Sequence, residues 1–198
     1  MKTDKTLPLE YSTQQNQLNI LGFWIFLGAE IMLFGTLFAG YFVLFDRTGN
    51  GPTGKEIFEI APVLFETFIL LTSSFTIGLA IHAMRNGNKK LTITFFIITL
   101  LLGVGFLGFE VSEFVHYVHI GAGLQTSAFT AALLTTLGTH GAHVTFGTFW
   151  GLLIVLQLKK RGLTPETTNK SFIFSLYWHF LDVVWIFIFS FIYLKGMV

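Results

Sequence analysis

The sequence contains no cysteine and very little charge. The absence of cysteine excludes disulfides, thiolate metal ligands and thiol nucleophiles from this chain. Charged residues make up 12% of the 198 positions, whereas roughly a quarter is usual in a soluble domain. Lys and Arg total 12 against 11 Asp and Glu, so the chain has no basic field that would attract nucleic acid. The composition argues against a nucleic-acid partner and favours a membrane protein.

Five apolar runs are each long enough to cross a bilayer. The hydrophobic fraction of the chain is 53%, and a membrane-spanning helix needs about 20 mostly apolar residues. The expected spans cover residues 18–45, 60–84, 91–118, 129–158 and 172–194. The breaks between them are polar or rich in Gly and Pro, and none is long enough to fold alone. The sequence predicts an all-α, polytopic membrane protein with one five-helix domain over residues 1–198, and with a polar N-terminal segment of 17 residues that is retained.

The distribution of basic residues predicts the orientation of this bundle. Nine Lys and Arg residues lie in the N-terminal segment and in the second and fourth breaks, and three lie on the other side. Cytoplasmic loops are enriched in Lys and Arg. We therefore expect the N-terminus in the cytoplasm and the C-terminus, after five spans, outside.

Ionisable residues inside the spans are the candidates for function, because each is costly to place in hydrocarbon. They are Glu30, Glu66, Glu110, Glu113, His140, His143, His179 and Asp182. Three pairs on three different spans have i, i+3 spacing, which places both members of a pair on one helix face. The expected arrangement is a buried polar network that holds the third, fourth and fifth spans together.

Two glycines on the face of His140 favour close helix packing. Gly147 and Gly151 form a G-x-x-x-G pattern in the fourth span, which would let another backbone approach closely.

No metal site is predicted from the spacing of these residues. A di-metal carboxylate bundle needs two Glu-x-x-His pairs, and only Glu113 and His116 have that spacing. Two His residues three positions apart on one face cannot sandwich a haem. Copper would favour additional sulfur ligands, and the zinc peptidase pattern H-E-x-x-H is absent. We expect no metal and no catalytic residue on this chain.

Two of the acids have alternative interpretations. Glu30 lies on an aromatic helix face with little to pair with inside its own span, so it is either a protonated structural carboxyl or a group that handles protons or seats a lipid. Glu66 lies near the start of the second span, where it could equally be a helix-end carboxylate.

Four stretches together resemble subunit III of the haem–copper terminal oxidases. They are LTSSFTIGLAIHAM, FLGFEVSEF, THGAHVTFG and LYWHFLDVVWIFIF, and the resemblance runs from about residue 22 to the C-terminus. Two positions beside these motifs, Thr139 before H-G-x-H and Leu176 before Y-W-H-F, differ from the cytochrome c oxidases. In them the chain is more similar to the proton-pumping quinol oxidases, of the cytochrome bo and Bacillus-type cytochrome aa kinds. The chain lacks the first two helices of the seven-span form, and the resemblance implies that subunit I supplies them.

The resemblance implies an accessory, non-redox role in a quinol oxidase that reduces oxygen to water. Haems and copper are expected on subunit I, and the expected partners are subunits I and II, a small subunit IV, phospholipid, and the quinol used by the complex. The expected location is the bacterial plasma membrane. Two alternatives remain open: subunit III of a cytochrome c oxidase, and a stand-alone proton-coupled transporter. A transporter would predict inverted repeats and broken helices, and no Pro interrupts spans one, three, four or five.

Overall fold

Five long helices run side by side in the computed structural model, which describes residues 7–49 and 51–197. They are α1 (Gln14–Leu44), α3 (Ile60–Arg85), α4 (Lys89–His119), α5 (Ala128–Arg161) and α6 (Pro165–Ile188), and α6 continues as a π-helix (Phe189–Leu194) and α7 (Lys195–Met197). Two short elements, a 3-10 helix (Leu9–Tyr11) and α2 (Gly54–Ile57), lie in the connections. Five helices are long and apolar enough to cross a membrane. This confirms the all-α, five-span architecture.

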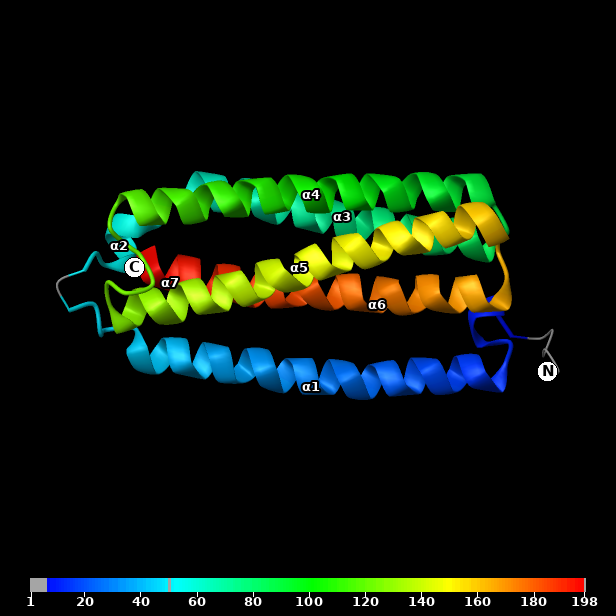
Figure 1. The fold of residues 1–198 in the computed structure, drawn as a ribbon, viewed down its shortest axis with the longest axis horizontal. Helices are drawn as coiled ribbons and strands as arrows, with labels where there is room; N and C mark the ends of the chain where they lie inside the picture. The colour runs from blue at the N-terminus through cyan, green and yellow to red at the C-terminus, as the bar shows by residue number, and fades with distance from the viewer. Residues whose placement is uncertain (1–6, 50, 198) are drawn as a thin grey trace.

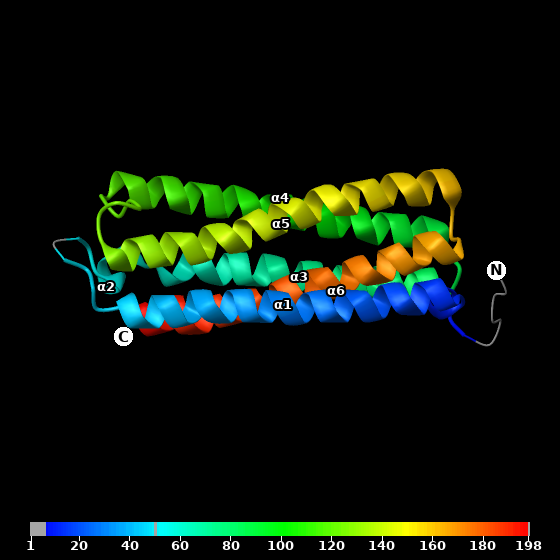
Figure 2. The ribbon, with the colours of Figure 1, turned by 60° about the horizontal axis from the view of Figure 1, so that its bottom comes forward.

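The helices form a four-helix group with α1 alongside it. The helix α3 packs against α4 and α6, and α5 packs against α4 and α6. The first helix, α1, contacts α5 and α6 and lies at the edge of the bundle in both views (Figure 1, Figure 2). Its membrane-spanning part is the least covered of the five, because 17% of that part is buried against 33–50% in the others.

Polar caps, not the edges of the apolar runs, set the helix ends. Thr164 caps α6 by accepting a hydrogen bond from the backbone of Thr167, and Pro165 occupies the first helical position. The helix therefore starts seven residues before the apolar run that begins at residue 172. At 1.5 Å per residue, the 34 residues of α5 extend about 51 Å, well beyond the hydrocarbon thickness of about 30 Å. The long helices thus carry polar turns outside the apolar layer.

The basic residues divide between the two ends of the bundle. Arg85 ends α3, Lys89 and Lys90 begin α4, residues 159–161 end α5, and Lys170 lies in the first turns of α6. These helix ends meet at the end of the bundle where α1 begins, whereas the connection with Arg47, α2 with Lys55 and α7 with Lys195 lie at the opposite end (Figure 1). Lys2 and Lys5 lie outside the described residues. The charge asymmetry of the sequence is therefore an asymmetry of the fold.

Candidate functional site

Glu30 on α1 and His143 on α5 form an ion-pair contact across the edge of the bundle. The Nε2 atom of His143 lies 3.1 Å from Oε2 of Glu30. The other ring nitrogen, Nδ1, lies 2.7 Å from the carbonyl oxygen of Thr139. The two side chains are 13% and 21% exposed, so the pair is reachable from the surface beside α1. The partner that the sequence of α1 could not supply therefore comes from α5.

The contact with Thr139 fixes the proton count of this pair. A carbonyl oxygen only accepts, so Nδ1 of His143 must carry a hydrogen. The contact between Nε2 and Glu30 then requires one further hydrogen, which resides either on the imidazole or on the carboxyl. One hydrogen therefore lies between Glu30 and His143 in this contact at the edge of the bundle.

His140, three residues before His143, has a different environment. It is fully buried, with its ring 5.4 Å from the Trp185 ring and 5.8 Å from the Phe106 ring. Neither ring nitrogen has a hydrogen-bond partner among the described residues. The two histidines of the motif therefore do not act as a unit.

Glu110 packs its carboxyl group against the backbone of α5. A Cβ atom built on Gly141 would lie 2.5 Å from Oε1 of Glu110 and 2.6 Å from its carboxyl carbon. Oε1 has no hydrogen-bond partner within residues 7–49 and 51–197. Glycine at position 141 is therefore required by the close approach of a buried carboxyl group.

Glu113 and Glu66 lie near the end of the bundle that carries α2. Glu113 accepts hydrogen bonds from the hydroxyls of Tyr117 (2.5 Å) and Tyr193 (2.7 Å). Glu66 is 1% exposed, and its Oε2 lacks a partner in the described part of the chain. Both acids line a cavity of about 480 Å³ between α3 and α4. Glu66 is thus a buried, cavity-lining carboxyl group, and not a helix-end carboxylate that caps α3.

His179 and Asp182 lie on the face of α6 that approaches α3. Nδ1 of His179 lies 2.6 Å from the hydroxyl oxygen of Ser74. Both carboxyl oxygens of Asp182 lack partners among the residues that the structure describes. His179, Asp182 and Ser74 therefore form a third polar site, separate from the Glu30–His143 pair and from Glu113 with its two tyrosines.

The hydrogen bonds correct the expectation of one polar network. Each i, i+3 pair does share a helix face, but its members pair with other partners: His143 with Glu30, His179 with Ser74, and Glu113 with two tyrosines. The reason is geometric. Spacing along a helix fixes which residues share a face, whereas helix packing decides what that face meets.

The two glycines of the G-x-x-x-G pattern face side chains instead of a neighbouring backbone. A Cβ on Gly147 would lie 3.0 Å from the Tyr177 ring. A Cβ on Gly151 would lie 2.5 Å from Leu100 and 2.8 Å from the Phe174 ring. Both positions make room for the large side chains that join α5 to α4 and α6.

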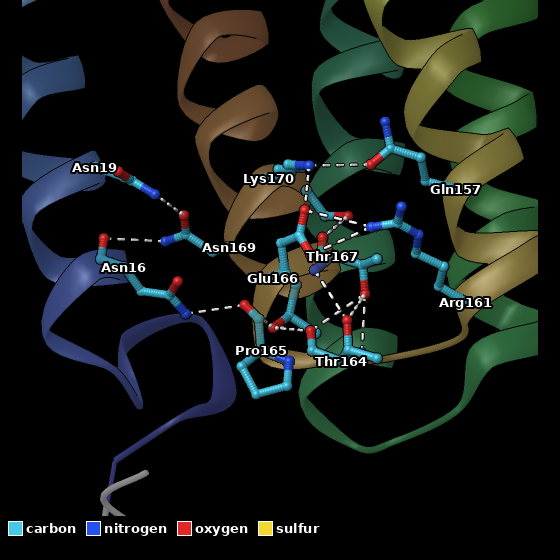
Figure 3. Close-up of polar contacts among 12 residues, drawn as sticks. Asn16, Asn19, Gln157, Arg161, Thr164, Pro165, Glu166, Thr167, Asn169 and Lys170 are labelled. Carbon is cyan, nitrogen blue, oxygen red and sulfur yellow. Dashed lines mark hydrogen bonds and ion pairs between the residues drawn. The ribbon is translucent and has the colours of Figure 1, made fainter. Parts of the chain in front are cut away.

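A polar cluster at the N-terminal end of the bundle was not found from the sequence (Figure 3). The side-chain amide of Asn169 donates to the carbonyl oxygens of Glu10 (3.0 Å) and Asn16 (3.1 Å). The amide of Asn16 donates to Pro165 (2.9 Å), and Nε of Arg85 lies 2.8 Å from Oε1 of Glu10. Asn residues near helix starts read as ordinary capping residues, so no sequence signal marked this junction of α1, α3 and α6.

Two buried tryptophans were also missed as polar contacts. The indole N–H of Trp178 donates to the hydroxyl of Ser73 (2.9 Å), and that of Trp185 donates to the hydroxyl of Thr67 (3.0 Å). Both bonds join α6 to α3, where the hydroxyls of Ser73 and Thr67 accept from indole groups.

No group of three or more His, Cys, Asp or Glu residues within 7–49 and 51–197 could hold a metal ion. The arrangement can therefore hold protons and hydrogen-bonded ligands at buried carboxyls and imidazoles. Together with the five spans, it defines a polytopic α-helical membrane protein whose interior carries isolated acid and imidazole groups.

Comparison with known proteins identifies the family of membrane proteins to which this chain belongs. Residues 10–197 match the profile of cytochrome c oxidase subunit III. The chain is 61% identical to quinol oxidase subunit 3 of Bacillus subtilis over 190 residues, which cover 96% of this chain and 93% of that protein. It is 47% identical to cytochrome c oxidase subunit 3 of Bacillus sp. PS3, over all of this chain and 95% of that one. The chain belongs to the cytochrome c oxidase subunit III family, and the resemblance found from its motifs is confirmed.

Proposed function

We propose that this chain is the accessory subunit 3 of a respiratory quinol oxidase that reduces oxygen to water and pumps protons. The observation that carries the proposal is the 61% identity to quinol oxidase subunit 3 over nearly the full length of both chains. The lower identity to a cytochrome c oxidase subunit, 47%, favours the quinol branch. Family membership leaves the stand-alone transporter without support.

In this role the chain itself performs no redox step. Haems and copper belong to subunit I, and the further partners are subunit II, a small subunit IV, phospholipid and the quinol used by the complex. The complex resides in the bacterial plasma membrane. The end of the bundle that carries most basic residues, and with it the N-terminus, faces the cytoplasm. Purification tests this assignment, because the chain should arrive with haem-containing partners and should carry no stoichiometric metal once separated from them.

The Glu30–His143 pair is the part of the chain that supports proton uptake by the complex. It lies at the partly exposed edge of α1, and the carbonyl contact of His143 leaves one shared proton between the two side chains. A proton held at a partly exposed position of the span is available for exchange with a neighbouring subunit or with bound lipid.

Glu30→Gln separates this role from a purely structural one. The glutamine amide can still donate a hydrogen bond to Nε2 of His143, so the packing of α1 on α5 is kept while the shared proton is removed. We expect normal assembly and a normal initial rate, followed by altered proton release per electron or faster inactivation during sustained turnover in reconstituted vesicles. Glu166→Gln, at an exposed acid in the first turn of α6, is the matched control. Wild-type values for both quantities in Glu30→Gln would reduce the pair to packing.

A further inference from the structure

One stripe of α6 is exposed between α1 and α3. The helix α6 packs against both α1 and α3, which lie on different sides of it (Figure 1). His179, Val183 and Ile186 follow one another at i+4 and i+3 spacing, so they share a helix face. Val183 and Ile186 are 54% and 39% exposed, and His179 is half-buried. These three residues form the floor of a groove between α1 and α3, which we call the α6 groove.

The two walls of the α6 groove are apolar. On the α1 side, a cavity of about 240 Å³ is lined by residues that include Gly35, Phe38 and Val183. A Cβ atom built on Gly35 would meet nothing within 4 Å, so a neighbouring backbone can approach closely there. On the α3 side, Leu71 shares the helix face of Ser74 and is 45% exposed. Such walls accept either a membrane-spanning helix or an acyl chain, and only the floor distinguishes the two.

The imidazole of His179 lies near the middle of the membrane span. The apolar helix that begins at Pro165 continues to Met197, a length of 33 residues. His179 is two residues from the midpoint of this helix, or about 3 Å along the axis. With the helix centred in the bilayer, the hydrocarbon layer extends about 15 Å to each side of that midpoint. The imidazole is therefore about 12 Å from the nearer boundary, out of reach of water and lipid headgroups.

One ring nitrogen of His179 has a partner in the chain, and the other has none. Nδ1 lies 2.6 Å from the hydroxyl oxygen of Ser74, whereas Nε2 makes no hydrogen bond within residues 7–49 and 51–197. A neutral imidazole has one N–H donor and one acceptor nitrogen, so Nε2 offers either a hydrogen or a lone pair. An unpaired polar group in hydrocarbon is costly, and an acyl chain cannot pair with it. The occupant of the groove must therefore bring a hydrogen-bonding group to the middle of the bilayer.

We propose that the α6 groove holds one membrane-spanning helix of another subunit, with a hydroxyl or carboxamide side chain hydrogen-bonded to Nε2 of His179. Hydroxyl and carboxamide groups both donate and accept, so they pair with Nε2 in either tautomer. Apolar residues of that helix pack against Gly35, Phe38 and Val183. The proposal rests on the proposed function, because it requires a complex with other subunits, and it adds the surface and the chemistry that hold one of them.

Photo-crosslinking from the groove identifies its occupant in the intact complex. Phe187 lines the cavity on the α1 side and is 46% exposed, and Phe187→p-benzoylphenylalanine keeps an aromatic ring there. We expect cross-links to a membrane-spanning segment of another subunit. Phe149, 62% exposed beside the cavity between α4 and α5, is the matched control for the same substitution. Identical products from the two positions would overturn the proposal, as would cross-links from position 187 to phospholipid alone or to a second copy of this chain. A complex that purifies with haem-containing partners but gives only those products would leave the proposed function intact.

Two substitutions at His179 separate the contact in the groove from the contact inside the chain. The amide group of Asn reaches about as far as Nδ1 of the imidazole, and that of Gln about as far as Nε2. His179→Asn therefore keeps the contact with Ser74 but loses the groove contact, and the cross-link yield from position 187 in detergent should fall about threefold to tenfold. His179→Gln should retain most of the yield, and so should His119→Asn at an exposed histidine that ends α4. Equal yields in His179→Asn and His179→Gln would overturn the proposal.

Discussion

The N-terminal end of the bundle and its interior differ in how completely their buried polar side chains are hydrogen-bonded. At the N-terminal end, Asn16, Asn169 and Arg85 each find partners on another segment. In the interior, Glu113 accepts from two tyrosines, but Asp182 and His140 have no partner among the described residues, although both are buried. A polar group is cheap beside water and expensive in hydrocarbon. The polar residues are thus least satisfied where they cost most.

The polar groups at the N-terminal end connect helices to one another, whereas the unpartnered interior groups only occupy space between helices. The contacts of Asn16 and Asn169 in Figure 3 join α1 to α6, and the ion pair of Arg85 with Glu10 adds α3. These hydrogen bonds replace those that water would make. The interior carboxyls are accommodated by glycine, by aromatic walls and by open space, as Glu110 is by Gly141. Substitutions in the two regions should therefore destabilise the protein by different amounts and for different reasons.

The largest effect is expected at Gly141. Gly141→Val places side-chain atoms where the carboxyl group of Glu110 lies, and overpacking of a buried contact costs about 3 kcal/mol. The free energy of unfolding, measured by SDS titration in bicelles, should fall by that amount. Adding Glu110→Ala should recover most of the loss, because it removes the obstructing group. A double variant as unstable as Gly141→Val would show that the contact with Glu110 is not the cause.

A smaller loss is expected at the N-terminal end. Asn169→Ala removes the amide donor of the carbonyl oxygens of Glu10 and Asn16 in a buried setting, which should cost about 2 kcal/mol. Proteolysis should also cut the N-terminal segment faster, which would show that this segment has detached from α6. Asn19→Ala loses the 3.3 Å hydrogen bond that Asn19 donates to Asn169 and an exposed 2.9 Å bond that it accepts from Gln15, and it serves as the control with a clearly smaller loss. Equal losses in the two variants would remove the special place of Asn169.

The Glu30–His143 pair should contribute less. A double-mutant cycle with Glu30→Ala and His143→Ala should give a coupling energy of about 1 kcal/mol, the range found for hydrogen bonds between membrane helices. The same cycle between Glu30 and His140 should give no coupling, since His140 contacts Phe106 and Trp185 instead. Coupling of Glu30 to both histidines would show that the two histidines of the motif act together.

The smallest effect is expected at Glu166. Its carboxyl lies 2.6 Å from Nζ of Lys170 and 3.3 Å from Arg161, but all three side chains are largely exposed. Exposed ion pairs contribute little and are screened by salt. Glu166→Gln should leave the thermal midpoint of the complex unchanged at physiological ionic strength, with a slight decrease at low salt. A large decrease in the thermal midpoint that persists in high salt would show that Glu166 is as important for stability as Asn169.

The amino-acid sequence by itself determined the solvent, the number of spans and the faces of the helices. Apolar runs of membrane-spanning length fix five helices because backbone polar groups must be paired inside the bilayer. The i, i+3 spacing of Glu110 with Glu113, or of His140 with His143, is a local property of the helix and is read directly. The motif stretches also carried the family assignment.

Only the tertiary structure decided which neighbour each of these faces meets. Glu30 gains His143 from a helix more than a hundred residues later in the chain, and Asn169 gains Glu10 across 159 positions. Such pairings depend on the rotation and offset of packed helices, which no spacing within one helix contains. The same holds for Gly141, whose need for a bare Cα arises from a carboxyl group on α4. Spacing along the chain decides which residues share a helix face, and helix packing decides which residues that face contacts.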